Sequence, residues 1–124
     1  MDPTPVFACD LSAMTPGQRA HHAELSVRLL GEARALEDLP NGYALVFESS
    51  ARQALELAEW MAMERLCCPF LTLAAEFAPE RGPLRLRLTG AAGIKPFLVH
   101  ELGLDRLGKE TWPEPLGPGG NTPS

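Results

Sequence analysis

Two adjacent cysteines, Cys67 and Cys68, directly precede a proline and concentrate the reactive chemistry of the sequence. Glu64 lies one helical turn before them, so on a helix its carboxylate shares a face with at least one thiol. The Cα atoms of neighbouring residues are about 3.8 Å apart, less than the roughly 4.4–6.8 Å of relaxed disulfides, so a bond within the pair is easily reduced. Because we expect a cytoplasmic protein and the chain has three cysteines, an odd number, the cysteines are predicted to be free thiols.

The position of the pair favours a ligand site over a bare nucleophile. Pro69 ends the predicted helix just after the cysteines, and a helix C-terminus carries partial negative charge. Glu64 adds a second negative group, so both features oppose a thiolate at Cys67 or Cys68. A bound cation reverses this balance, because metal coordination deprotonates thiols and is favoured by nearby carbonyl and carboxylate oxygens. We therefore interpret the pair as ligands of a soft metal or metalloid ion, and the predicted partner is a metal ion or a small molecule.

Two further residues complete the predicted metal site. Cys9 stands just before the turn into the first predicted helix, on which His22 falls within the apolar stripe while His21 points to solvent. Three thiolates, or two thiolates and an imidazole, suit Zn(II), Cu(I) or a heavier thiophilic metal. The predicted metal ligands are therefore Cys67, Cys68, Cys9 and His22.

Glu64 and Cys68 are the candidate catalytic residues. In the leading interpretation, Glu64 orients the metal site or accepts a proton. If the ion keeps an open coordination position, the same carboxylate would assist metal-bound chemistry, such as protonation during cleavage of a metal–carbon bond. In the second interpretation the protein is a thiol enzyme or redox sensor, in which Cys68 reacts, Cys67 or Cys9 resolves the product and His22 acts as base.

A third interpretation assigns no chemistry to the cysteines. Free cysteine packs readily as a small hydrophobic residue, so all three side chains fit a core. The sheet or a helix face would then bind another protein or a second copy of the chain as a homodimer. His22 would be a hydrogen-bonded core histidine, and Glu64 would be a solvated helix residue or an ion-pair partner.

Capping and periodicity place these residues on a series of short elements. A capping box with proline at the first helical position, Thr15-Pro16-Gly17-Gln18, opens one helix, and Ser50 opens another. Leucine and arginine alternate from Leu84 to Leu88, which predicts a strand with one buried face. The predicted elements are a strand at Val6–Cys9, a helix at Pro16–Asp38, a strand at Tyr43–Glu48, a helix from Ser50 to Pro69, a hairpin of strands at Phe70–Phe77 and Leu84–Thr89, and a helix at Ile94–Leu102.

The order of these elements predicts an α/β (α+β) two-layer sandwich, β-α-β-α-β-β-α, with helices on a mainly antiparallel or mixed sheet. The strand order within the sheet stays open. Residues 1–108 form one compact domain in this prediction, because single cores commonly contain about 100–150 residues. The Pro- and Gly-rich segment 109–124 buries little and is predicted to be a flexible, disordered tail.

Composition and charge exclude several classes of protein. The chain has 124 residues, 45% hydrophobic and 22% charged, which is typical of a globular protein. Its formal net charge of −5 disfavours nucleic acid as a partner, and no apolar stretch is long enough to cross a membrane. Met1–Asp10 lacks the basic-then-apolar order of a secretory signal, so we expect a cytoplasmic protein. Gly90 and Gly93 belong to no GxGxxG or Walker motif, so no nucleotide or flavin is predicted.

The motif residues resemble those of a group of small bacterial proteins. The resemblance covers roughly residues 6–103, the region with structural periodicity, and its most specific element is the Cys-Cys-Pro-Phe tetrapeptide. It implies that the cysteine pair forms a site with Cys9 and Glu64, and it carries no particular activity. The residues that show the resemblance are Cys9-Asp10-Leu11, Glu64-Arg65-Leu66-Cys67-Cys68-Pro69-Phe70, and Leu86-Arg87-Leu88-Thr89-Gly90 with Gly93 and Phe97-Leu98.

Overall fold

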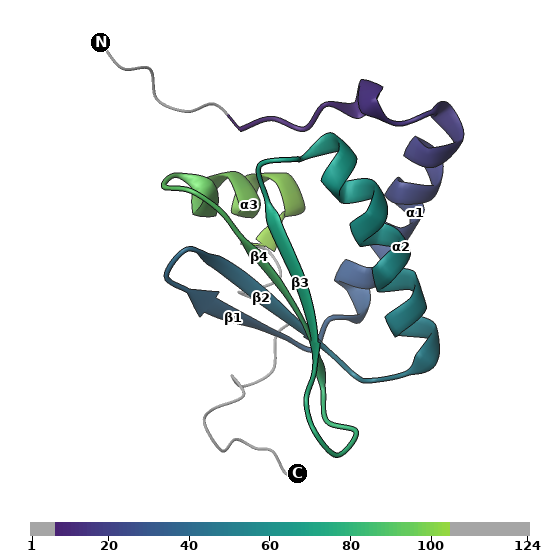
Figure 1. The fold of residues 1–124 in the computed structure, drawn as a ribbon, viewed down its shortest axis with the longest axis vertical. Helices are drawn as coiled ribbons and strands as arrows, with labels where there is room; N and C mark the ends of the chain where they lie inside the picture. Colours follow the sequence, from purple (N-terminus) through teal and green to yellow (C-terminus); the bar gives the residue numbers. More distant parts are fainter. Residues whose placement is uncertain (1–6, 105–124) are drawn as a thin grey trace.

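The computed structural model describes residues 7–104, in which helices lie beside one antiparallel sheet (Figure 1). The elements are η1 (Leu11–Ala13, a short 3-10 helix), α1 (Pro16–Glu32), β1 (Ala35–Leu39), β2 (Gly42–Phe47), α2 (Ala51–Cys67), β3 (Thr72–Phe77), β4 (Leu84–Thr89) and α3 (Ile94–Leu102). The strands are ordered β1-β2-β4-β3, and every neighbouring pair is antiparallel. The predicted α/β sandwich with an antiparallel sheet is therefore confirmed.

The hydrophobic core lies between the sheet and the helices. On β4, Leu84, Leu86 and Leu88 are almost fully buried in this core, as the alternation of leucine and arginine predicts. The intervening arginines point to the other face of the sheet, where Arg85 Nε donates to Glu37 Oε1 at 3.1 Å. The helices therefore pack against the leucine face.

The first helix is shorter than predicted. Its start is as expected, because Thr15 Oγ1 accepts a hydrogen bond from the backbone N–H of Gln18 at 3.1 Å. However, α1 ends at Glu32, and residues 35–39 form β1, which pairs with β2. Leu36 fits a helical stripe and a strand face equally well. A two-residue turn between β1 and β2 allows the segment to pair with the strand that follows. This local hairpin forms in place of a longer α1.

The segment from Phe7 to Cys9 forms no strand, in contrast to the prediction. The two edges of the sheet are β1 and β3, and the segment instead lies at the end of α2 (Figure 1). There the backbone N–H of Asp10 donates to the carbonyl oxygen of Cys67 at 2.8 Å. Val6 and the predicted tail at 109–124 lie outside the described residues.

Contacts between α1 and α2 set the relative position of the two helices that carry the predicted site. Trp60 Nε1 of α2 donates to Ser26 Oγ of α1 at 2.8 Å. Arg28 of α1 pairs with Glu56 of α2 at 2.6 Å. These contacts hold facing side chains together along the two helices, so residues of α1 reach the last turns of α2.

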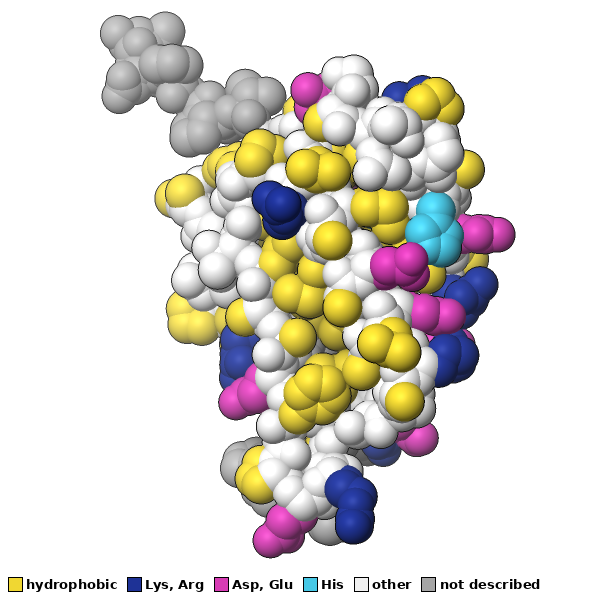
Figure 2. Space-filling view, turned by 45° about the vertical axis from the view of Figure 1, so that its right-hand side comes forward, with side chains coloured by type: hydrophobic (Ala, Val, Ile, Leu, Met, Phe, Trp, Pro, Cys, Tyr) yellow, Lys and Arg dark blue, Asp and Glu magenta, His cyan; other side chains and the backbone are white. Residues whose placement is uncertain are grey.

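Exposed hydrophobic side chains gather on the face where α2 lies (Figure 2). Leu55 of α2 is 71% exposed and Phe77 of the edge strand β3 is 59% exposed. An interaction module of the kind in the third interpretation would depend on such a surface. Within residues 7–104, no helix combines the length and the apolar character that a membrane-spanning segment needs.

Candidate functional site

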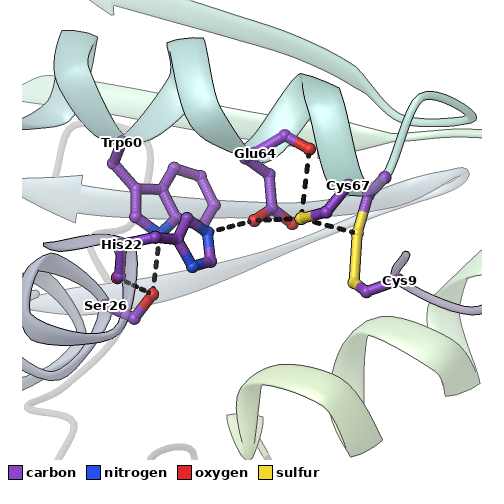
Figure 3. Close-up of a disulfide and its surroundings, with 7 residues drawn as sticks. Cys9, His22, Ser26, Trp60, Glu64 and Cys67 are labelled. Atoms are coloured by element: carbon purple, nitrogen blue, oxygen red, sulfur yellow. Dashed lines mark hydrogen bonds and ion pairs between the residues drawn. A yellow bond between two sulfur atoms is a disulfide. The ribbon is translucent and has the colours of Figure 1, made fainter. Parts of the chain in front are cut away.

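The candidate site lies where the N-terminal segment, α1 and the end of α2 meet (Figure 3). The sequence assigns these residues to elements but does not give the distances between the elements. The structure brings all the predicted site residues into one contiguous cluster. Cys9 comes from the N-terminal segment, His22 from α1, Glu64 and Cys67 from α2, and Cys68 caps the C-terminus of α2.

Both adjacent cysteines point into the protein because the helix ends between them. Cys67 is the last residue of α2, whereas Cys68 has non-helical backbone angles, φ −129° and ψ 67°. Consecutive side chains of a continuing helix diverge by about 100°. The break in the helix removes this divergence, and both side chains are fully buried with their Sγ atoms 3.8 Å apart. The helix end therefore brings two neighbouring sulfurs to one place.

Cys9 and Cys68 form a disulfide, so the expectation of free thiols is wrong for these two residues. Cys67 is the free cysteine. The expectation relied on a cytoplasmic location and on the odd cysteine count, and an odd count still allows one bond between two residues 59 positions apart in the chain. Packing of the N-terminal segment against α2 brings their Cα atoms to 4.9 Å, within the usual range for disulfides.

Four atoms of metal-ligand type converge at the end of α2. The sulfurs of the three cysteines and a carboxylate oxygen of Glu64 all lie within 4.8 Å of one another. Glu64 Oε1 is 3.9 Å from Cys67 Sγ, and the Glu64 side chain is only 3% exposed. Three sulfurs and a carboxylate in so small a volume make a donor set that suits a soft ion once the disulfide is reduced.

His22 reaches the site through Glu64 and is not one of the four convergent donors. Its Nε2 lies 2.7 Å from Glu64 Oε1, and its ring stacks on Trp60 with centroids 5.8 Å apart and planes inclined by 14°. The His22 side chain is 15% exposed, against 43% for His21, so the predicted directions of the two histidines are confirmed. His22 therefore partners a buried carboxylate that faces the sulfurs.

Ser26 supports this arrangement and was missed by the sequence analysis. Its hydroxyl donates to the carbonyl oxygen of His22 at 2.8 Å and accepts from Trp60 Nε1 at 2.8 Å. Ser26 lies one turn after His22 on the same helix face. That spacing is the signal that would have pointed to it, because a polar residue on an inward-facing stripe needs a partner.

Burial raises the pKa of the Cys67 thiol from 9.0 to about 11, and the negative charge of Glu64 adds to the effect. The dry surroundings disfavour a charged thiolate, and the carboxylate repels it. The protonated thiol donates to the carbonyl oxygen of Glu64 at 3.6 Å. Cys67 is therefore a neutral thiol and a poor nucleophile near neutral pH, as its place at a helix C-terminus predicts.

The Cys67 thiol should lose its proton only in alkaline solution. In the oxidised protein, the ultraviolet absorbance of its thiolate should rise with a midpoint near pH 11, measured as the difference between the unaltered protein and the Cys67→Ser variant. Folding raises this pKa from 9.0 to about 11, so between these pH values the folded state keeps a proton that the unfolded state loses. The stability contributed by Cys67 is thus present below about pH 9 and is lost as the pH rises toward about 11. A midpoint near pH 9 would contradict this assignment.

Replacing His22 by alanine should destabilise the protein, because the buried carboxylate of Glu64 loses its partner. Leaving such a group unsatisfied costs about 1–3 kcal/mol. His21→Ala is a matched control on the same helix, and we expect it to change the free energy of unfolding by less than about 0.5 kcal/mol. Urea unfolding of the two oxidised variants measures the difference. Equal effects would mean that the His22–Glu64 contact contributes nothing to stability.

Comparison of the chain with protein-family models, with curated proteins and with solved structures finds no match. Its function is therefore inferred from the chemistry of the site. The features that bear on it are the convergent sulfurs, the buried carboxylate beside them and the raised pKa of Cys67.

Proposed function

We propose that the reduced protein binds a soft metal ion through the thiolates of Cys9, Cys67 and Cys68. Glu64 supplies a fourth ligand or orients the site from just outside it. The observation that carries the proposal is the convergence of three sulfurs and one carboxylate oxygen within 4.8 Å. In a reducing compartment such as the cytoplasm all three cysteines would be thiols and open to coordination.

Distances within the cluster support tetrahedral coordination. Zinc–sulfur bonds are near 2.3 Å, so two sulfurs of one tetrahedral shell lie about 3.8 Å apart. The Sγ atoms of Cys67 and Cys68 are 3.8 Å apart, and Cys67 Sγ is 3.9 Å from Glu64 Oε1. Little movement of α2 is then needed for these residues to share an ion. After reduction, the sulfur of Cys9 must separate from that of Cys68 to admit it.

Contacts other than the disulfide hold the N-terminal segment beside the pair. The backbone N–H of Asp10 donates to the carbonyl oxygen of Cys67 at 2.8 Å. The ring of Phe7 packs against that of Phe70, with centroids 5.0 Å apart. Neither contact requires the disulfide, so the reduced chain keeps its third sulfur near the other two. Ligands held in place in this way lose less conformational entropy on binding.

The surroundings favour coordination over free thiolate chemistry. Cys67 keeps its proton at neutral pH because its pKa is about 11, whereas a bound ion displaces the proton outright. His22 is placed like the outer partners of metal ligands, since its Nε2 at 2.7 Å fixes the carboxylate oxygen that faces Cys67. The same features that make Cys67 a weak nucleophile are therefore compatible with a ligand.

Titration of the reduced protein with Zn(II), Cu(I) and Hg(II) under anaerobic conditions tests the proposal. We expect one ion per chain, thiolate-to-metal absorption in the ultraviolet and protection of all three thiols from alkylation. The oxidised protein is the control, because two of its ligand sulfurs are bonded to each other. Full alkylation of the reduced protein in the presence of each ion, with no new absorption, would rule out metal binding.

Thiol–disulfide redox chemistry is the second candidate function, and the Cys9–Cys68 disulfide favours it. Cys67 is placed to attack this bond, since its Sγ is 3.8 Å from that of Cys68. It ranks second because the pKa of Cys67 is raised to about 11 and its side chain is fully buried. Both properties slow the attack of Cys67 on the disulfide at neutral pH. Rapid alkylation or peroxide oxidation of Cys67 near pH 7 would reverse this order.

A further inference from the structure

We propose that oxidation of Cys9 and Cys68 to their disulfide releases the bound ion, with a low-molecular-weight disulfide as the oxidant. This inference rests on the proposed metal binding and adds redox control to the same site. The observation behind it is that two of the proposed ligands are bonded to each other in the structure. The protein would then hold its ion when reduced and give it up when oxidised.

The disulfide and the metal site compete for two sulfurs. A disulfide sulfur lacks the negative charge of the thiolate that a soft ion prefers. Once Cys9 and Cys68 are bonded, the cluster retains Cys67 and Glu64 as donors. One free thiol and one carboxylate are too few ligands for a tight four-coordinate site, so the oxidised form is the weak binder.

Burial decides which sulfur meets the oxidant first. Cys9 is partly exposed, whereas Cys67 and Cys68 are fully buried. The Cys9 thiolate attacks one sulfur of an oxidant R–S–S–R, which breaks the S–S bond, forms a mixed disulfide and releases R–S⁻. The attacking sulfur thereby leaves the ion, and a second, internal step can follow.

The second step closes the bond that the structure contains. The Cys68 thiolate attacks the Cys9 sulfur of the mixed disulfide, forms the Cys9–Cys68 bond and releases a second R–S⁻. Two electrons pass from the two cysteines to the oxidant, which becomes two thiolates. The ion has then lost two thiolate ligands and dissociates. Cys67 takes no part in the exchange and remains a free thiol.

Equilibration of the unaltered protein with reduced and oxidised glutathione, at fixed pH and with free zinc set by a metal buffer, tests the inference. Metal binding and reduction must promote each other to the same extent. At half-oxidation, the ratio of oxidised glutathione to the square of reduced glutathione should therefore rise tenfold for each tenfold rise in free zinc above the dissociation constant. This corresponds to a rise of about 30 mV in the midpoint reduction potential. Mass spectrometry should find one ion released for each Cys9–Cys68 disulfide formed.

The outcomes separate this inference from the proposed function. Zinc binding by the reduced protein together with a half-oxidation ratio that does not vary with zinc overturns the redox control and leaves metal binding standing. Failure of the reduced protein to bind zinc overturns both. The Cys9→Ser variant lacks one ligand and binds zinc more weakly, but at a free zinc concentration that saturates it, added oxidised glutathione should release no zinc. Cys67→Ser should still form the disulfide. Zinc loss from Cys9→Ser at the rate of the unaltered protein would also overturn the mechanism.

Discussion

The Cys68→Ser variant of the reduced protein should bind zinc about 100- to 1,000-fold more weakly than the unaltered chain. Four-ligand zinc sites bind with about 10–16 kcal/mol, or roughly 2.5–4 kcal/mol for each ligand, and about 1.4 kcal/mol corresponds to a factor of ten. Serine preserves the size of the side chain but offers no thiolate. Cys68 is the sulfur in contact with both other cysteines, at 3.8 Å from Cys67 and bonded to Cys9. Competition with a chromophoric chelator measures the affinity.

A matched variant separates loss of a ligand from a general effect of adding serine. Ala62→Ser introduces the same residue on the exposed side of α2, outside the site, and should leave zinc affinity unchanged. Glu64→Gln should weaken binding by about 10- to 100-fold, the usual effect of disturbing a residue that orders metal ligands. Far-ultraviolet circular dichroism checks that each variant is folded. A change of less than threefold for Cys68→Ser would remove this residue from the ligand set.

Reduction of the Cys9–Cys68 disulfide should lower the free energy of unfolding by about 4 kcal/mol. The cross-linked residues are 59 positions apart, and closing a loop of that length lowers the entropy of the unfolded chain by about that amount. Single domains have about 5–15 kcal/mol of stability in total, so this loss is large. Urea unfolding with and without reductant measures it. The Cys67→Ser variant should show the same loss, because Cys67 is outside the bond.

Zinc should restore the stability of the reduced protein. A ligand at 1,000 times its dissociation constant stabilises the folded state by about 4 kcal/mol if it does not bind the unfolded chain. The oxidised protein should gain much less, since it offers fewer donors. An unchanged urea midpoint on reduction would contradict the loop-entropy argument. It would mean that the unfolded chain gains little conformational entropy when the cross-link is removed.

Local patterns predicted most of the fold because they depend on residues close together in the sequence. The capping box at Thr15 and the alternation around Leu86 each describe a single element, and both are confirmed. The strand β1 was missed for the same reason. Leu36 satisfies helical and strand periodicity alike, and the choice is made by pairing with β2, which is a contact between two elements.

The candidate site was predictable in its members but not in its bonds. A helical wheel gives the direction of His22, and spacing gives the shared face of Glu64 and Cys67, but neither gives the distance across two packed helices. The 2.7 Å contact between His22 and Glu64 therefore emerges only from the tertiary structure. The same holds for the disulfide of Cys9, which depends on where an irregular segment lies.

The segment that carries Cys9 adjoins the end of α2 without belonging to the sheet. Its attachments include the hydrogen bond from Asp10 to Cys67 and the aromatic contact of Phe7, so its detachment in the reduced protein breaks no strand pairing. Fraying of such a segment requires far less free energy than global unfolding. A local opening of this segment would thus set the rate at which an ion binds to the buried sulfurs or leaves them, while the sheet and the helices stay folded. Amide hydrogen exchange at Asp10 would report that opening.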